Sequence, residues 1–148
     1  MPSEVLLVQG TSIKISVAAQ TELAPSPTPT FATLDCLSRE IQWQGGTASE
    51  NDVTTICSTA KEFRLGLKDS GTMSVSGHWK QGHPAHTVIR TADADKQTRL
   101  IVVEFEDGST FSALALISQR SWSAAVDGIV SATYNFRLTG DTLEVDAT

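Results

Sequence analysis

Cysteine is scarce in this chain of 148 residues, which contains only Cys36 and Cys57. Two cysteines are too few for a disulfide scaffold, so we expect two buried or half-buried thiols and a fold held by a hydrophobic core. The sequence also lacks an apolar run of about 20 residues, the length that crosses a bilayer. Its first residues lack the basic and apolar regions of a secretory signal. These absences predict a globular protein that folds in a cytoplasm and has no membrane partner.

Positive charge is scarce as well. Lys and Arg total 11 against 17 Asp and Glu, which gives a formal net charge of −6. Proteins that hold nucleic acid by its phosphates usually carry the opposite excess. The balance argues against a DNA-binding module, but it is compatible with a surface that nucleic acid passes without sticking, and equally with an ordinary acidic protein. The length fits one domain over residues 1–148.

Motifs of catalysis and of metal or cofactor binding are missing. No serine lies in a Gly-x-Ser-x-Gly turn, and no phosphate-binding glycine loop is present. His78, His83 and His86 are close in sequence, but a metal site needs ligands that converge, and we place the first on a strand and the others around a helix start. Residues 93–95 (Asp-Ala-Asp) resemble the start of a calcium loop without its glycine and later glutamate. We therefore predict no enzymatic activity and no cofactor.

The strongest pattern that is present is the alternation of apolar and polar residues with a period of two. It runs through residues 128–139, 72–79 and 13–17, and it is typical of strands with one buried and one solvated face. The residues expected on the buried face are Val130, Ala132, Tyr134, Phe136, Leu138, Met73, Val75, Trp79, Ile13, Ile15 and Val17.

Two further segments, 99–105 and 110–117, are apolar on both faces, as in central strands. Asp107-Gly108 lies between them and is a hairpin-turn dipeptide. Asp127-Gly128 is a second such dipeptide, after a short strand predicted at 122–126. Connections of this kind make the second half of the chain antiparallel.

One segment has the period of a helix. Pro84 stands where a first helical residue is expected, and an apolar stripe follows at Ala85, Val88, Ile89 and Ala92. We predict a helix at about residues 84–95 that packs on the sheet, because a single stripe cannot bury itself. Residues 60–65 have weaker local helical character.

Two stretches predict extended loops, at about residues 20–31 and 45–70. The first has prolines at positions 25, 27 and 29, which remove backbone donors, and the second begins with small polar residues. The predicted fold is mainly β: an antiparallel β-sandwich or barrel with one flanking α-helix.

The order of these elements resembles the major tail tube proteins of long-tailed bacteriophages, which share a fold with the tube protein of type VI secretion. The helix leads to a strand ending in FEDG (residues 105–108), then to the strand TFSALALI, a short strand, and a closing strand ending in FRLTG (residues 136–140). Residues 60–79 (AKEFRLGLKDSGTMSVSGHW) resemble the same family. The likeness spans Val53 to Gly140.

The resemblance implies a structural subunit that forms hexameric rings, which stack into a hollow tube through which the genome passes. The partners it implies are further copies of the chain and other tail proteins such as the tape measure, tail tip and terminator. Viral DNA would be in non-specific transit only. The implied location is the virion tail, after assembly in the cytoplasm of the host bacterium.

A tube requires a ring interface that closes and a stacking interface that does not. Exposed strand edges pair readily and suit the first, with the solvated strand faces lining the lumen. The candidate lumen-facing residues are Thr72, Ser74, Ser76, His78, Ser131, Thr133, Asn135 and Arg137. Long loops suit the second interface. The candidate inter-ring residues are Gly45, Gly46, Thr47, Glu50, Asn51, Asp52, Lys61, Arg64, Lys68 and Asp69.

Two other functions are compatible with the patterns. A monomeric β-sandwich module that binds carbohydrate would use Trp43, Trp79 and Trp122 as a sugar platform, although tryptophans are more often core or interface anchors. A small β-barrel enzyme would need a pocket with converging polar groups. The tube hypothesis instead predicts rings, tubes and an acidic channel.

Overall fold

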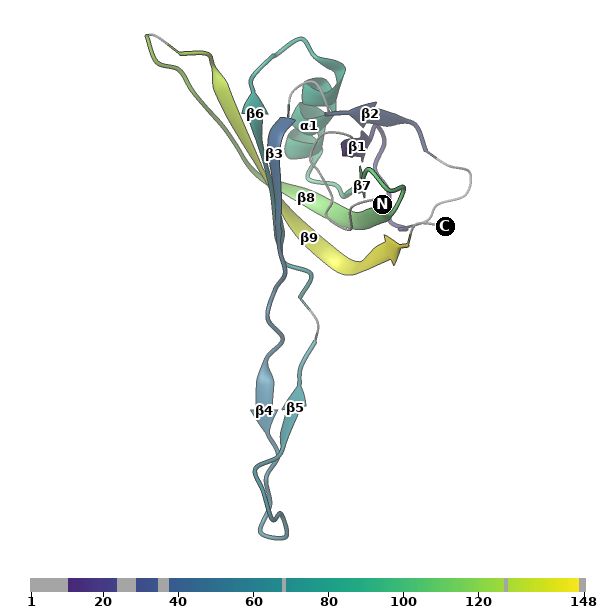
Figure 1. The fold of residues 1–148 in the computed structure, drawn as a ribbon, viewed down its shortest axis with the longest axis vertical. Coiled ribbons are helices and arrows are strands. Elements are labelled where there is room, and N and C mark those ends of the chain that lie inside the picture. Colours follow the sequence, from purple (N-terminus) through teal and green to yellow (C-terminus); the bar gives the residue numbers. More distant parts are fainter. Residues whose placement is uncertain (1–10, 24–28, 35–37, 68, 127, 147–148) are drawn as a thin grey trace, which may run out of the picture.

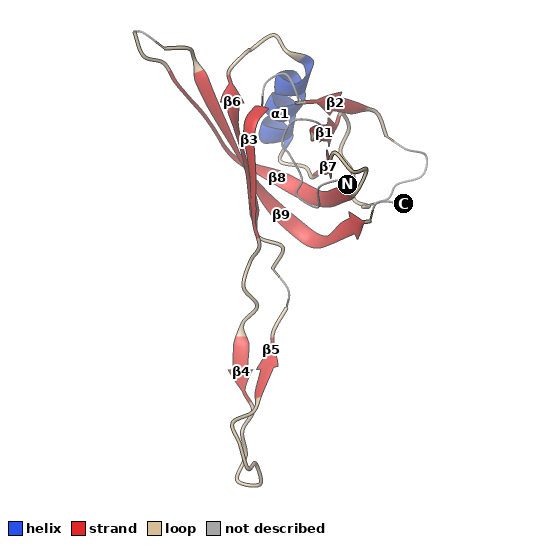
Figure 2. Ribbon diagram, viewed as in Figure 1, coloured by secondary structure: helices blue, strands red, loops and turns tan. Residues whose placement is uncertain are grey.

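The computed structural model describes residues 11–23, 29–34, 38–67, 69–126 and 128–146. Within them lie nine strands and one helix, shown in Figures 1 and 2. The elements are β1 (Ser12–Ser16), β2 (Phe31–Thr33), β3 (Ser38–Gln44), β4 (Glu50–Asp52), β5 (Phe63–Leu65), β6 (Thr72–His78), α1 (Pro84–Asp95), β7 (Arg99–Glu104), β8 (Thr110–Ser123) and β9 (Ser131–Val145).

Seven strands form one antiparallel sheet in the order β2-β1-β7-β8-β9-β6-β3, while β4 and β5 pair only with each other. The predicted antiparallel, mainly β fold with one flanking helix is confirmed. The described strands do not close into a barrel, because β2 and β3 remain as the two edges of the sheet.

The sheet bends because its two longest strands are bent. The pairing of β8 with β9 shifts register between Ala113 and Leu114 and again between Ile117 and Gln119, and such bulges bend a strand. Gly140, at φ 75°, supplies a left-handed residue beside the first shift. The bend brings β3 over β8, where the ring centroids of Trp43 and Phe111 are 4.8 Å apart. The two halves of the sheet thus enclose the core.

The predicted buried face is confirmed at nearly every position. Met73, Val75 and the inward residues of β1 and β9 are buried in one cluster, and Trp79 packs against it while partly exposed. Val17 and Val130 are the exceptions, with 45% and 39% exposure. Each lies just outside a strand, after β1 and before β9, so no neighbouring strand covers it.

Two local predictions were wrong. Residues 60–65 do not form a helix, since Phe63–Leu65 is β5. These residues pair with β4, and an isolated helical turn there would have had no surface to pack on. The segment 122–126 is not a separate strand either, because Trp122 and Ser123 complete β8 and residues 124–126 are loop. The expected burial of Cys57 is wrong as well, because this thiol is exposed in the loop between β4 and β5, where no other element packs on it. Pro25, Pro27, Cys36, Lys68 and Asp127 lie outside the described residues.

The helix occupies the predicted residues, and its predicted stripe is buried. His83 caps its start, where Nδ1 accepts a hydrogen bond from the backbone N–H of Ala85 at 3.2 Å. Lys96 ends it in the left-handed region, and its N–H donates to the carbonyl of Ala92. The helix contacts β8, β2 and β1, and its buried stripe joins the core cluster on this side of the sheet.

His86 is a buried member of this helix that the apolar stripe did not predict. Its side chain is 1% exposed, its Nδ1 lies 3.0 Å from the hydroxyl of Tyr134, and its ring meets Trp79 edge-on. Burial, and then the positive charge of Arg120, lowers the pKa of His86. Burial likewise raises the pKa of Tyr134. The buried site therefore favours the neutral form of the His86 imidazole.

We expect the free energy of unfolding to fall as the pH is lowered below 6.5, the ordinary histidine pKa. Below this pH the unfolded chain binds a proton at His86 that the folded chain does not, because folding lowers the pKa of His86. The contribution is complete above this pH and is lost as the pH falls toward the folded value. Denaturant titrations from about pH 7.5 to about pH 5 measure it.

The control for this prediction is His86→Asn, which keeps a polar atom for Tyr134 but does not titrate. The two proteins differ only at position 86, so a difference between their pH dependences reports on this residue. The variant should show a flatter dependence of stability on pH. Equal slopes for the two proteins would contradict the role of His86.

Candidate assembly surfaces

The eight predicted lumen-facing residues lie on neighbouring strands, β6 and β9. They pair directly across the ladder: Thr72 with Arg137, Ser74 with Asn135, Ser76 with Thr133, and His78 with Ser131. Directly opposed residues of antiparallel strands point to the same side of a sheet. The structure therefore unites two separately predicted sets on one surface, opposite the buried face of the same strands.

The surface continues onto the strands on either side. We call the following residues the polar face: the eight above, with Glu40, Gln42 and Gln44 of β3 and Gln119, Ser121 and Ser123 of β8, which pair with them in register. The sequence analysis missed the contribution of β3. The alternation of Glu40, Gln42 and Gln44 with Ile41 and Trp43 is the signal that would have found it.

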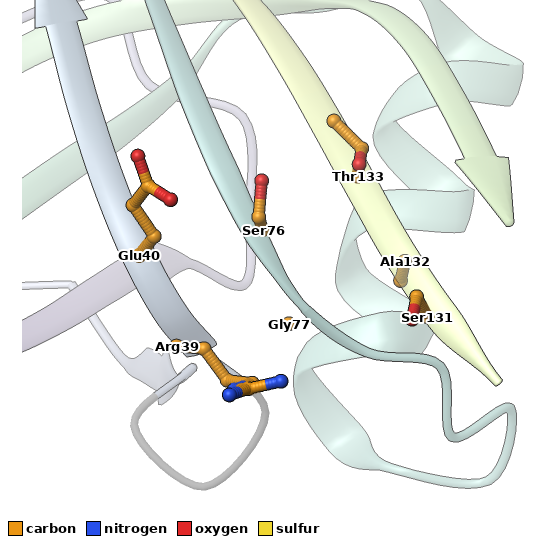
Figure 3. A pocket seen from close by; sticks show the side chains of 7 residues that line it. All are labelled: Arg39, Glu40, Ser76, Gly77, Ser131, Ala132 and Thr133. Carbon is orange, nitrogen blue, oxygen red and sulfur yellow. The ribbon is translucent and has the colours of Figure 1, made fainter. Parts of the chain in front are cut away.

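A shallow depression lies on the polar face where β3, β6 and β9 run side by side (Figure 3). Its polar groups are hydroxyls of Ser76, Ser131 and Thr133 and the charged side chains of Arg39 and Glu40. Neighbouring strands present these groups in rows, as in an extended polar surface.

The charges of the polar face occur beside charges of opposite sign. The guanidinium of Arg137 donates to both carboxylate oxygens of Asp69, at 2.9 and 2.8 Å. The backbone N–H of Gly71 also donates to this carboxylate, and these bonds, that of Gly71 first, hold the pKa of Asp69 below its usual value. Arg39 and Glu40 are sequence neighbours. This surface is therefore rich in hydroxyl and amide groups and carries charges of both signs, while the acidic channel stays a prediction.

Residues 45–71, which we call the arm, leave the sheet between β3 and β6. Its strands pair Glu50 with Leu65 and Asp52 with Phe63, and Figure 1 shows the hairpin projecting along the longest axis of the molecule. The predicted inter-ring residues are spread along it: Gly45, Gly46 and Thr47 at the base, Glu50, Asn51, Asp52 and Arg64 in the ladder, and Lys61 before β5. Lys68 lies outside the described residues.

The base of the arm is tied to the sheet. Besides the ion pair of Asp69, the indole N–H of Trp43 donates to the carbonyl of Ser70 at 3.0 Å, and the N–H of Leu138 donates to the carbonyl of Gly71 at 3.0 Å. The hydroxyl of Ser70 donates to the carbonyl of Gly140. Asp69 was predicted as an inter-ring residue, and within the chain it joins the arm to Arg137 of the polar face.

The arm carries large apolar side chains that the chain itself does not cover. Ile56 and Leu67 are almost fully exposed, and the remaining members of this set are Val53, Phe63 and Leu65. Grouped exposed apolar side chains on a small protein mark surfaces that bind a partner. The sequence did not reveal them, because exposure depends on what packs above each residue.

A second exposed apolar group lies at the turn between β8 and β9. We call the described residues 122–126 and 128–130 the β8–β9 tip. Trp122, Val126 and Ile129 are more than half exposed there. In Figure 1 the hairpin that ends in this turn lies at the end of the long axis opposite the arm.

Two strand edges of the sheet are open beside the polar face. β3 is an edge strand whose neighbour is β6. β7 pairs with β8 only as far as Ala115, so residues 116–123 of β8 have β9 as their single neighbour among the described strands. The polar face is thus bounded on both sides by backbone available for pairing.

The residues considered for chemistry have other roles. Among the described residues no His, Cys, Asp and Glu cluster could hold a metal ion, and no helix is long and apolar enough to cross a membrane. Asp93 pairs with Lys96 and Arg120, and Asp95 pairs with Arg99. Trp43 packs on Phe111 and Trp79 on His86, so these two tryptophans have packing partners within the chain, while Trp122 is exposed.

The sequence matches the family of phage tail tube proteins over residues 27–143. The chain belongs to this family. The predicted resemblance is confirmed, and the match extends toward the N-terminus beyond the segment Val53 to Gly140. No curated protein sequence matches the chain.

Solved structures with the same fold include chains of virion and tail assemblies. A chain of the virion of the native gene transfer agent particle has a TM-score of 0.70 and 17% identity, with 96% of this tail tube protein and 100% of that chain covered. A chain of the empty gene transfer agent tail, computed with C6 symmetry, has a TM-score of 0.67 and 18% identity, at 96% and 100% coverage. The SPP1 tail tube has a TM-score of 0.60 and 15% identity, with 95% of this protein and 78% of that chain covered. At these identities the likeness concerns the fold.

Proposed function

We propose that this protein is the non-enzymatic building block of a phage tail tube, in which hexameric rings stack around a hollow channel. The observation that carries the proposal is the polar face, which spans four strands in register and has an open strand edge on each side. Joining β3 of one subunit to residues 116–121 of β8 in the next would continue the sheet around a ring. The C6 symmetry of the gene transfer agent tail supports six subunits.

The polar face would line the channel. Its hydroxyl and amide groups hydrate well, and its cation Arg137 is engaged by Asp69. Arg39 and Glu40 add one charge of each sign, so the lining has no net positive charge and binds phosphates weakly, because affinity for nucleic acid arises mainly from neutralised phosphates. DNA would therefore pass without being held.

The arm would make the contact between rings, since it projects from the sheet and carries apolar side chains. The remaining partners would be other tail proteins, including the tape measure, tail tip and terminator. The mature location would be the virion tail, after assembly in the host cytoplasm.

Negative-stain electron microscopy of the purified protein over a range of concentrations tests the proposal. Hollow rings at moderate concentration and tubes at high concentration are the expected result, with the open β3 and β8 edges buried. A strictly monomeric protein at every concentration, also when the other tail proteins are added, would contradict the proposal.

A further inference from the structure

The two exposed apolar groups of this protein lie at opposite ends of its longest axis. The arm extends from one end and the β8–β9 tip from the other (Figure 1). At the first end Leu65 is 70% and Ile56 103% exposed, and at the second Trp122 is 62% and Val126 102% exposed. Neither group contributes a residue to the buried core.

Such a pair of surfaces is what an open stack requires. A contact between identical patches closes after two copies, whereas a contact between two different patches continues from copy to copy. With two complementary patches at opposite ends of one axis, each ring binds one neighbour through its first patch and the next neighbour through its second.

The charges near the two groups are complementary. On the arm, the carboxylates of Glu50 and Asp52 share a face with Leu65 and Phe63 because they pair across the ladder. At the other end, the N–H of Trp79 bonds the carbonyl of Val130, which places the exposed Lys80 beside the tip. Arg39 lines the depression together with Ser131 at the first residue of β9. Arg64 pairs with Asn51 and so points to the opposite face of the hairpin. The ladder face that carries Phe63 and Leu65 is thus bordered by acidic side chains, and the tip is bordered by basic side chains.

We propose that the arm of a subunit in one ring docks on the β8–β9 tip of a second copy in the next ring, with Phe63 and Leu65 against Trp122 and Ile129. This inference rests on the proposed function. It adds the surface that receives the arm, and it predicts that the tip takes part in stacking and not in ring closure.

A pair of introduced thiols provides a direct test. In a background of Cys36→Ser and Cys57→Ser, Phe63→Cys places a thiol on the arm and Ile129→Cys places one on the tip. Mild oxidation of assembled tubes should join the arm thiol of one copy to the tip thiol of another and give a ladder of chains longer than dimers on non-reducing gels. The control has Val17→Cys in place of Ile129→Cys and should give no ladder, because Val17 is exposed but follows β1 and belongs to neither apolar group.

A mixing experiment separates the two patches. An arm variant (Phe63→Ser with Leu65→Ser) and a tip variant (Trp122→Ser with Ile129→Ser) should each form rings but no tubes, with the concentration needed for stacking raised by at least about tenfold. Each variant keeps the patch that the other lacks. Mixed in equal amounts, they should therefore give stacks of two rings that do not grow further, and Val17→Ser should form tubes like wild type.

The outcomes distinguish the two proposals. Tubes of the protein with Phe63→Cys and Ile129→Cys that give no ladder on oxidation, or a tip variant that forms tubes normally, would overturn the docking proposal and leave the tube function standing. A tip variant that fails to form rings would assign the tip to ring closure and also overturn it. Wild-type protein that forms neither rings nor tubes would contradict the proposed function and this inference together.

Discussion

A protein whose outer arm, residues 49–66, is replaced by two glycines should form rings but no tubes. The replaced segment contributes nothing to the buried core, and its ends are adjacent, since the N–H of Gly66 lies 2.6 Å from the carbonyl oxygen of Ser49. We expect the free energy of unfolding to change by less than about 1 kcal/mol, because a shorter loop alters closure entropy only slowly. Loss of stacking should be complete, because the apolar side chains of the arm are removed at every subunit of a ring.

Electron microscopy and sedimentation compare this shortened protein with wild type. The matched control is Lys61→Ser with Arg64→Ser, which retains the arm and its apolar residues and should still form tubes. Tubes of normal length from the shortened protein would show that stacking does not depend on the arm. Loss of rings as well would show that the arm also closes the ring.

The second large effect is expected from Gly71→Ala, which should destabilise the protein by about 2–4 kcal/mol. Gly71 has φ 87°, and a Cβ there would lie 2.0 Å from the carbonyl oxygen of Gln44 and 2.6 Å from the amide nitrogen of Gly46. The left-handed conformation alone costs an alanine about 1 kcal/mol or more, and the clash forces backbone apart at the base of the arm. Urea or guanidinium unfolding measures the change.

Substitutions at two other glycines separate the cost of the left-handed backbone from the cost of the steric clash. Gly108→Ala shares a positive φ of 94° but meets no atom within 4 Å, so it should cost about 1 kcal/mol. Gly82→Ala has neither feature and should change stability by less than about 0.5 kcal/mol. A cost for Gly71→Ala no greater than that for Gly108→Ala would show that the base of the arm adapts to the added methyl group.

Much of the fold was predictable because local periodicity reports which side of an element is buried. The stripe from Ala85 to Ala92 predicted the helix, and its predicted range agrees with α1. Alternation predicted the inward residues of β6 and β9, and it failed at Val17 and Val130, where the strand ends one residue earlier or begins one residue later. Periodicity cannot define such ends, because the partner strand decides where pairing stops.

The candidate surfaces were predictable only in part. The polar residues of β6 and β9 could each be identified from their own strand, but nothing local indicates that Thr72 faces Arg137 or that Ser76 faces Thr133. Those pairs join residues that are distant in the chain, and their register depends on the packing of Met73, Tyr134 and the rest of the core. The polar surface of β3 was missed for a related reason. Its alternation is short and lies between loops, and only the pairing with β6 identifies it as part of the same surface.

The sequence by itself determined a globular, mainly β protein with one helix, a tail-tube-like order of elements, and a loop of small polar residues after β3. These properties follow from composition, period and turn residues, which act over a few positions of chain. Tertiary structure alone decided that Arg137 is bound by Asp69, that His86 is buried against Tyr134, and that apolar side chains stand exposed at both ends of the molecule. Each of these depends on which distant segments pack together, and solvent exposure is a property of that packing and not of the residue type.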